Sequence, residues 1–287
     1  MKLGISYSVF DGEELLEASL KCMRPHAYHI VVVYQTVSYT GNPASQTLLP
    51  LLHDLKERQW IDTLLYYPTH PNRSPSGEER RKRNVGLRHI AGVHHQACTH
   101  YMTMDTDEFY LPEAFDAAKV AFLEGGYDAS VCPMVDYFKS PRVQLAPFEQ
   151  HQDYYVPCIS ALPVKNTLAR SLVGYPFWGT HRHGKQKHYP VLSDTTRQVP
   201  YQRMKIFKRE ELVMHHMSLV RKDIKSKFLN SSAQTILKTL PASHLERYEA
   251  YYQAWQPPQT IHTPYDTAFA VGYPYTVLPD DPFGIAF

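Results

Sequence analysis

Three carboxylates stand together near the middle of the chain, in Asp105-Thr106-Asp107-Glu108. The segment directly follows residues 101–104, which have the apolar character of a buried strand. Two aspartates two residues apart at a strand end can point to one side and offer the oxygen ligands that Mg²⁺ and Mn²⁺ prefer. Such a site leaves coordination positions for phosphate oxygens. The pattern therefore predicts a divalent metal that binds a phosphorylated ligand.

The triplet Asp-x-Asp is expected about once by chance in a chain of this composition, so its context has to carry the prediction. A solvated turn before a helix is the alternative interpretation, because acidic residues also suit a helix N-terminus. However, three clustered like charges are costly without a cation. We therefore interpret Asp105 and Asp107 as metal ligands, with Glu108 as a third carboxylate beside them.

The elements before this segment alternate between strand and helix patterns. Strands are predicted at residues 3–9, 29–34, 63–67 and 101–104, and helices begin near residues 13, 45 and 76. Residues 76–79 have the form of a capping box for the third helix, which is expected to reach residue 98. This order predicts an α/β fold with a mostly parallel sheet flanked by helices. Ligands of such sheets bind at the carboxyl ends of the strands.

The second half of the chain has a different pattern. After a helix at 112–124, aromatic stretches at 127–138 and 154–162 predict mixed or antiparallel strands, followed by short strands at 206–207 and 212–214. A basic helix is predicted at 221–240. We expect a catalytic domain at 1–240, divided into a nucleotide-binding half (1–110) and an acceptor-side half (111–240). Residues 241–287 are expected to form a C-terminal extension, partly helical, that wraps the domain.

The strand at 3–9, the strand at 30–34, the helix containing Arg83-Asn84-x-Gly86 and the segment 102–109 together resemble the GT-A nucleotide-diphospho-sugar transferases, especially bacterial family 2-like enzymes. The later stretch 214–232 resembles one bacterial subset of these transferases. The resemblance implies a glycosyltransferase of hexosyltransferase type that uses a sugar nucleotide, a carbohydrate acceptor such as a surface glycan, and Mn²⁺ or Mg²⁺. Family members commonly carry an acidic residue that pairs with uracil where this chain has Gln35. A Gln side chain both donates and accepts, so a UDP-linked donor remains the expectation.

The resemblance also implies roles for residues around the acidic segment. One or two side chains of the basic cluster 80–83 are expected to face the nucleotide, and the others to face solvent. A histidine late in the domain completes the metal shell in many members of the family, and His216 is the expected ligand, with His215 in reserve because neighbours on a strand face opposite ways. The residues expected to contact the donor are Tyr7, Ser8, Gln35, Arg83, Asn84, Asp105, Thr106, Asp107, Glu108 and Arg197.

An inverting transfer by direct displacement needs a general base for the acceptor hydroxyl. We expect Asp194 in this role, because Arg197 could orient it, with Glu149 and Asp153 as further candidates. The histidine-rich loop 181–188 is either a contact for phosphate or acceptor or an ordinary surface loop. Six aromatic residues could stack on sugar rings or belong to the core: Tyr137, Phe138, Tyr154, Tyr155, Phe177 and Trp178.

Composition limits the other function classes. The net charge of +2 among 287 residues argues against a nucleic-acid partner. No signal peptide or apolar run long enough for a membrane span is present, so we expect a cytoplasmic protein with at most peripheral membrane contact. The four scattered cysteines predict reduced, packed thiols. The alternative functions are a metal-dependent phosphohydrolase or nucleotidyltransferase that uses the same carboxylates, and a non-catalytic sugar-binding module.

Overall fold

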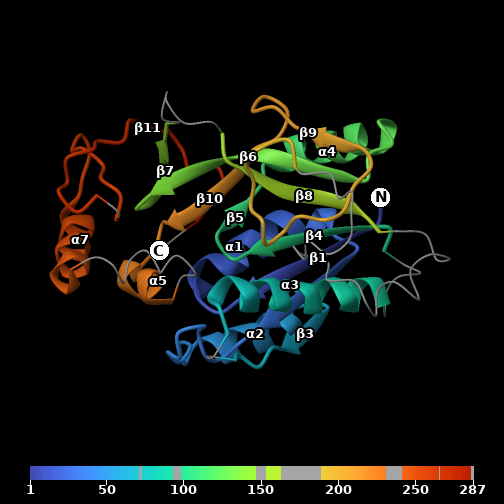
Figure 1. Cartoon of the computed structure of the whole chain (residues 1–287), viewed down its shortest axis with the longest axis horizontal. Helices are drawn as coiled ribbons and strands as arrows, with labels where there is room; N and C mark the ends of the chain where they lie inside the picture. The colour runs from blue at the N-terminus through green and yellow to red at the C-terminus, as the bar shows by residue number, and fades with distance from the viewer. Residues whose placement is uncertain are drawn as a thin grey trace.

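The computed structural model describes residues 1–287 except 71–72, 93–97, 147–152, 163–188, 231–240, 265 and 286–287. In this part of the chain, one mixed sheet runs in the order β11-β7-β6-β8-β4-β1-β2-β3, with β5, β9 and β10 attached beside it (Figure 1). Helices lie on both of its faces. The predicted α/β class, with a parallel first half and a mixed second half, is confirmed.

The parallel half of the sheet consists of β1 (Leu3–Val9), β2 (His29–Tyr34), β3 (Thr63–Tyr66) and β4 (His100–Asp105). Strand β1 lies in the centre and pairs in parallel with β2 and β4. The unbroken apolar run in β2 is explained by burial on both faces, since Ile30 to Val33 are fully buried. The carboxyl ends of β1 and β4 are therefore adjacent, which places Ser8 beside Asp105 in the register.

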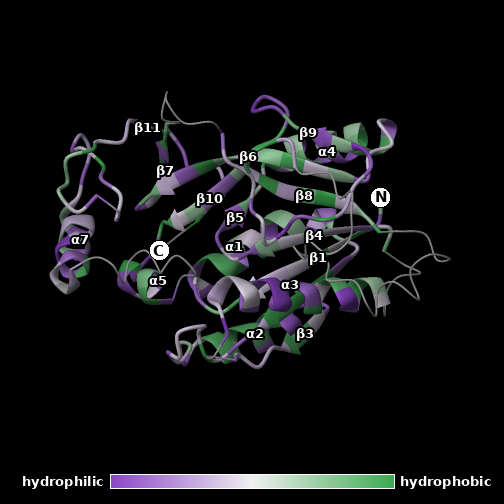
Figure 2. Cartoon of the chain, viewed as in Figure 1, coloured by the Kyte–Doolittle hydropathy of each residue, from purple (hydrophilic) through white to green (hydrophobic). Residues whose placement is uncertain are grey.

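Four helices cover the two faces of this half. The helices α1 (Glu13–Met23), α2 (Leu48–Glu57) and α4 (Pro112–Glu124) pack through their apolar residues on the face of β1 that carries Ile5 and Tyr7. Helix α3 (Pro75–Gly92) packs with Leu87 and Ile90 on the opposite face. Figure 2 shows a strongly hydrophilic stretch in α3, although this helix lies directly on the sheet.

The second half of the sheet is formed by β6 (Ala129–Phe138), β7 (Ser140–Leu145), β8 (Tyr155–Ala161), β9 (Met204–Ile206) and β11 (Tyr275–Val277). Strand β8 joins the two halves by antiparallel pairing with β4 and β6. Strand β10 (Met214–Leu219) lies between β5 (Glu108–Phe109) and β6. This position brings the segment after residue 213 against the strand that follows Asp107.

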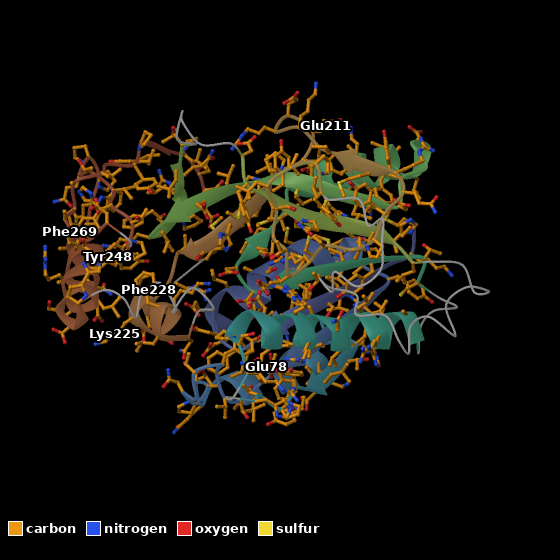
Figure 3. The ribbon with its side chains drawn as sticks, in the orientation of Figure 1. Glu78, Glu211, Lys225, Phe228, Tyr248 and Phe269 are labelled. Atoms are coloured by element: carbon orange, nitrogen blue, oxygen red, sulfur yellow. The ribbon has the colours of Figure 1, made fainter. Side chains whose placement is uncertain are left out.

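The C-terminal part packs against the end of the second half. This part contains helices α5 (Ile224–Asn230) and α7 (Ala242–Ala254). The remaining helix of the described residues is the short 3-10 helix η1 (Arg24–His26), which follows α1. Figure 3 shows Phe228 of α5 near Tyr248 of α7 and Phe269 of the tail, and these side chains belong to one buried cluster. The tail then returns to α1 and β5 through Ile285. No helix in the described part of the chain is long and apolar enough to cross a membrane.

Several boundaries differ from the sequence predictions, and three of them bear on the site. The capping box at 76–79 is not formed, because α3 already begins at Pro75 and the Glu79 side chain, which would close the box, accepts a hydrogen bond from Arg83 Nη2. Strand β10 begins at Met214, so the two histidines lie inside a strand and not after one. The basic helix begins at Ile224, three residues later than predicted, and its predicted end lies outside the described residues.

Candidate metal and nucleotide site

The three carboxylates lie where β4 ends and β5 begins, at the carboxyl edge of the parallel strands. Each of Asp105, Asp107 and Glu108 offers one oxygen, and these oxygens all lie within 4.8 Å of one another. Glu108 Oε2 also accepts the backbone N–H of Asp105 at 3.1 Å, which fixes the turn. The predicted clustering of carboxylates is therefore present.

Arg197 joins the rear of this cluster to a distant part of the chain. Its guanidinium donates to Asp105 Oδ2 at 2.8 Å and to both oxygens of Glu108, and its Nε atom forms an ion pair with Asp194 Oδ2 at 2.8 Å. Arg83 of α3 also donates to Asp105 Oδ2, again at 2.8 Å. Both arginines are nearly fully buried. Because both Glu108 oxygens accept hydrogen bonds from Arg197, Glu108 contributes to the architecture of the site.

Asp107 is neutralised from the opposite side of the cluster by two cations that follow β10. Arg221 Nη2 donates to Asp107 Oδ2 at 2.6 Å, and Lys227 Nζ of α5 donates to the same oxygen at 2.8 Å. The Arg221 guanidinium fits against Gly12, where a Cβ atom would stand 1.7 Å from Nη1. Gly12 also has φ +79°, a left-handed conformation suited to glycine. The residue thus makes room for the cation that holds Asp107.

The charges around the carboxylates keep two of them ionised. Burial by itself raises the pKa of Asp105, but the positive charges of Arg83 and Arg197 outweigh it and bring the pKa to about 2. Burial is likewise outweighed at Asp107, where Lys227 and Arg221 hold the pKa well below its usual range. For Glu108, burial and the nearby Asp105 charge raise the pKa despite Arg197. Asp105 and Asp107 are therefore the two carboxylates available to a cation.

His216 reaches the same cluster from β10. Its register partners are Glu108 on β5 and Asp136 on β6. The ring Nδ1 lies 2.7 Å from Asp136 Oδ1, and Nε2 lies 4.0 Å from Asp107 Oδ1. His215 points the other way, with Nδ1 at 2.8 Å from Tyr137 Oη and its ring against Phe283. Burial lowers the pKa of His215 to about 4, as expected for a packed neutral ring.

A cleft opens in front of these residues and has a volume of about 140 Å³. It is lined by Ser8, Phe10, Asp11, Gln35, Tyr39, Glu79, Lys82, Asp105, Thr106, Asp107, His216, Arg221, Lys227 and Asn230. A larger hollow of about 510 Å³ adjoins it and shares Phe10, Asp11 and Asn230 as lining residues. The acidic cluster thus forms one wall of a mixed-charge cleft.

Other residues of the cleft lining carry polar atoms without partners among the described residues. Gln35 is buried, and its Nε2 donates to Val37 O at 2.9 Å, which leaves Oε1 without a hydrogen bond. Ser8 Oγ is also buried without a partner. Lys82 is buried with its Nζ donating to Val9 O at 2.9 Å, and burial lowers the pKa of this lysine to about 7. Buried polar groups normally find partners, so this part of the lining fits a polar ligand.

The structure brings some of the predicted donor residues to the cleft and leaves others away from it. Ser8, Gln35, Asp105, Thr106, Asp107 and His216 line it. Arg83, Asn84, Glu108 and Arg197 do not line the cleft. Tyr7 is fully buried with its hydroxyl at 3.1 Å from Ser19 Oγ, so its side chain faces the core instead of the cleft. One or two side chains of the basic cluster 80–83 were expected to face the nucleotide; Lys82 of this cluster is buried and lines the cleft.

The candidate bases have different surroundings. Asp194 Oδ1 accepts from Thr196 N and Oγ1, while Oδ2 is held by Arg197. Asp153 accepts from Arg209 at 2.5 Å. Neither lines the cleft, and the base role of Asp194 stays a prediction. Glu149, Phe177, Trp178 and the loop 181–188 lie outside the described residues, whereas Tyr137 and Phe138 belong to the core.

Sequence reasoning did not identify three residues of the site as parts of it, and it included Lys82 only as a member of the basic cluster 80–83. Asp136, Arg221 and Lys227 contact the acidic cluster or its histidine, and Lys82 lines the same cleft. The only local signal for the two cations is the basic composition after β10, which equally fits a solvated helix. No local signal marks Asp136. Its role depends on the pairing of two strands 80 residues apart.

Comparison with known proteins gives fold-level similarity only. No family model and no curated protein matches the sequence. The fold is similar to S. aureus TarS, with a TM-score of 0.44 at 14% identity over 88% of this chain and 43% of TarS, so the chain spans less than half of that structure. TarS 1–349 in complex with UDP gives 0.45 at 13% identity, over 88% of this chain and 71% of that one. Mannose-1-phosphate geranyltransferase from Thermus thermophilus gives 0.31 at 12% identity, over 93% of this chain and 67% of that enzyme.

Proposed function

We propose that this chain is a glycosyltransferase that moves a sugar from a nucleoside-diphosphate sugar, UDP-linked, to a carbohydrate acceptor with the help of Mn²⁺ or Mg²⁺. One observation carries the proposal. Asp105 and Asp107, at the end of β4, share a cleft with His216 of β10 and with the unpartnered polar atoms of Gln35 and Ser8. Metal ligands and groups suited to a nucleobase thus face the same small space.

The residues present fit a divalent cation. Asp107 Oδ1 and His216 Nε2 lie 4.0 Å apart, while the other oxygen of Asp107 and the other ring nitrogen are occupied by protein partners. Asp105 is partly exposed toward the cleft and supplies a further oxygen. Oxygen ligands with one imidazole suit Mn²⁺ and Mg²⁺. When bound there, the metal supplies charge stabilisation to a leaving diphosphate.

Two residues of the cleft lining can distinguish uracil from cytosine. Val37 O fixes the Gln35 amide nitrogen, so the Oε1 atom that remains can only accept a hydrogen bond. Lys82 Nζ donates to Val9 O and, when protonated, has further N–H groups to donate. A base edge that combines an N–H group with a neighbouring carbonyl satisfies both residues, as the imide of uracil does. Cytosine presents an unprotonated ring nitrogen in the same place, which faces Gln35 Oε1 without a hydrogen bond.

Cations on the cleft wall suit the diphosphate. Lys227 and Arg221 both line the cleft and both contact Asp107. Lys227 is partly exposed and can turn from Asp107 to a phosphate oxygen, whereas Arg221 is buried and stays to hold the carboxylate. Lys227 is thus assigned to binding the donor, and Arg221 to positioning a metal ligand.

The transfer itself is proposed to be inverting, by direct attack of the acceptor hydroxyl. Asp194 is retained as the general base, joined to Asp105 through Arg197. If Asp194 takes the proton, Asp194→Asn lowers kcat by at least about a hundredfold and leaves the affinity for the donor nearly unchanged. Equal losses in kcat and in donor binding would indicate that Asp194 supports the arginine network instead.

The experiment that tests the function is a binding panel. UDP, CDP, GDP and UDP-sugars are titrated against the protein by calorimetry, with and without Mn²⁺. We expect binding that requires Mn²⁺, and a preference for UDP over CDP of about tenfold or more, because a mispaired buried acceptor costs about 1–3 kcal/mol.

Two variants make the panel specific. Asp107→Asn should abolish the Mn²⁺ requirement together with tight binding, whereas the matched control Asp116→Asn, on the exposed side of α4, should bind like the parent chain. Failure of every nucleotide to bind in the presence of Mn²⁺ would overturn the proposal. Release of free phosphate without transfer to any acceptor would favour the phosphohydrolase alternative.

A further inference from the structure

Asp136 contacts His216 in the way expected of a residue that orients a metal ligand. It lies on β6, and its Oδ1 atom accepts from His216 Nδ1 at 2.7 Å. The pairing of β6 with β10 sets these two residues side by side in register. The side chain of Asp136 is 41% exposed, whereas that of His216 is 22% exposed. Asp136 is not among the residues that line the cleft, so it anchors the histidine from outside it.

This anchoring decides which ring nitrogen faces the carboxylates. A carboxylate only accepts hydrogen bonds when ionised, so Nδ1 carries the proton in the pair. In the neutral ring, the lone pair is then on Nε2, the atom that faces Asp107 Oδ1. Without Asp136, the ring could turn about its Cβ–Cγ bond or adopt the other tautomer. Either change removes the lone pair from the cleft.

The spacing across the cleft also agrees with a shared cation. Bonds of about 2.1 Å place two ligand atoms about 3.0 Å apart at a right angle and about 4.2 Å apart on opposite sides of a metal. The 4.0 Å between His216 Nε2 and Asp107 Oδ1 lies within this range. The distance is too long for a direct hydrogen bond, so these two atoms do not satisfy each other.

We infer that Asp136 is a positioning residue that fixes the orientation and tautomer of His216 as a metal ligand, which rests on the proposed metal-dependent function. Carboxylates that accept the second ring N–H of a metal-bound histidine typically strengthen metal binding by 10–100-fold. Asp136 acts only through His216, because no other contact joins it to the acidic cluster among the described residues. The contribution of Asp136 to Mn²⁺ affinity must therefore vanish when His216 is replaced.

The test is a double-mutant cycle with Mn²⁺ alone as the probe. Free Mn²⁺ is measured by electron paramagnetic resonance during titration of the parent chain, Asp136→Asn, His216→Ala and the double variant. We expect a loss of affinity of roughly 10–100-fold for Asp136→Asn, and no additional loss when it is combined with His216→Ala. Asp136→Glu should restore part of the affinity.

The matched control is Asp116→Asn, because Asp116 also accepts from a histidine Nδ1, that of His26 at 2.9 Å, but lies away from the cleft. It should leave the Mn²⁺ affinity unchanged. Parent-level Mn²⁺ affinity in Asp136→Asn would overturn the inference about Asp136 while leaving the metal site intact. An equal loss in the presence and absence of His216 would also overturn it. If the parent chain binds no Mn²⁺, both this inference and the metal dependence of the proposed function fail.

Discussion

Lys227 Nζ lies 2.8 Å from Asp107 Oδ2, so a lysine ammonium rests on the carboxylate that we assign to the metal. Asp107 is buried, and its negative charge requires a cation even when no metal is bound. The lysine provides that charge from α5, a short helix joined to the segment after β2 by the hydrogen bond between Asn230 and Asn42. The site can therefore fold before its ligands bind.

Replacing Lys227 should separate metal binding from nucleotide binding. In Lys227→Met, Asp107 loses one competing cation, so Mn²⁺ alone should bind about fivefold more tightly, equivalent to roughly 1 kcal/mol. UDP in the presence of Mn²⁺ should bind more weakly, because a phosphate partner is missing. Calorimetric titration of each ligand checks both effects. Lys225→Met serves as the control on the same helix, since Lys225 contacts Glu249 at the surface, and parallel changes in both variants would contradict the assignment.

Arg197 should be essential for stability because it neutralises the buried Glu108 and the partly exposed Asp105 at once. In Arg197→Gln, Asp105 and Glu108 lose this partner, and we expect the free energy of unfolding to fall by about 3–5 kcal/mol. Urea unfolding followed by circular dichroism provides the measurement. Arg58→Gln removes an arginine that pairs with Asp54 and Glu17 on the surface, and should cause no measurable change. A similar stability in both variants would show that the network is not needed for folding.

Gly12 should tolerate no side chain, for two separate reasons. Gly12→Ala places a Cβ atom in a left-handed backbone conformation, which costs about 1–2 kcal/mol, and also 1.7 Å from Arg221 Nη1. Gly41 has φ +94°, but a Cβ atom added there would have nothing within 4 Å. Gly41→Ala therefore isolates the cost of the left-handed backbone. We expect Gly12→Ala to be less stable than Gly41→Ala by at least about 2 kcal/mol in thermal unfolding. Equal destabilisation would mean that Arg221 moves aside freely.

Acid should destabilise the fold through His100. Burial, followed by the charge of the N-terminal ammonium, lowers the pKa of His100 from 6.5 to about 4 in the folded chain. Between these pH values the unfolded state binds more protons than the folded state, so stability falls as the pH decreases from 6.5 to 4. The full difference corresponds to at most about 3 kcal/mol.

Urea unfolding at pH 7 and pH 4 tests this dependence in the parent chain and in His100→Gln. The variant cannot titrate at this position, and its stability should depend less steeply on pH. His100 Nδ1 lies 2.8 Å from Thr99 Oγ1, a contact that a glutamine amide can imitate. An identical pH dependence in both proteins would exclude His100 as a source of acid sensitivity.

The amino-acid sequence by itself predicted the parallel half of the sheet and the place of the acidic segment. Strands β1 and β2 have the bounds expected from their apolar runs, and Asp105 ends β4 as predicted. These features depend on local patterns, because apolar periodicity within a segment reports which of its faces will be buried. The opposite orientations of His215 and His216 also follow from strand geometry alone.

Only the tertiary structure decided which charged groups surround the carboxylates. Arg197, Arg221 and Lys227 are 92, 114 and 120 residues from their aspartates, and Asp136 is 80 residues from His216. A charged residue in a sequence carries no sign of its burial, since solvated and paired charges have the same local composition. The cost of burying a charge is offset only by partners that strand register and loop paths bring together. For the same reason, Lys82 could be recognised as part of the cleft only once α3 was packed on the sheet.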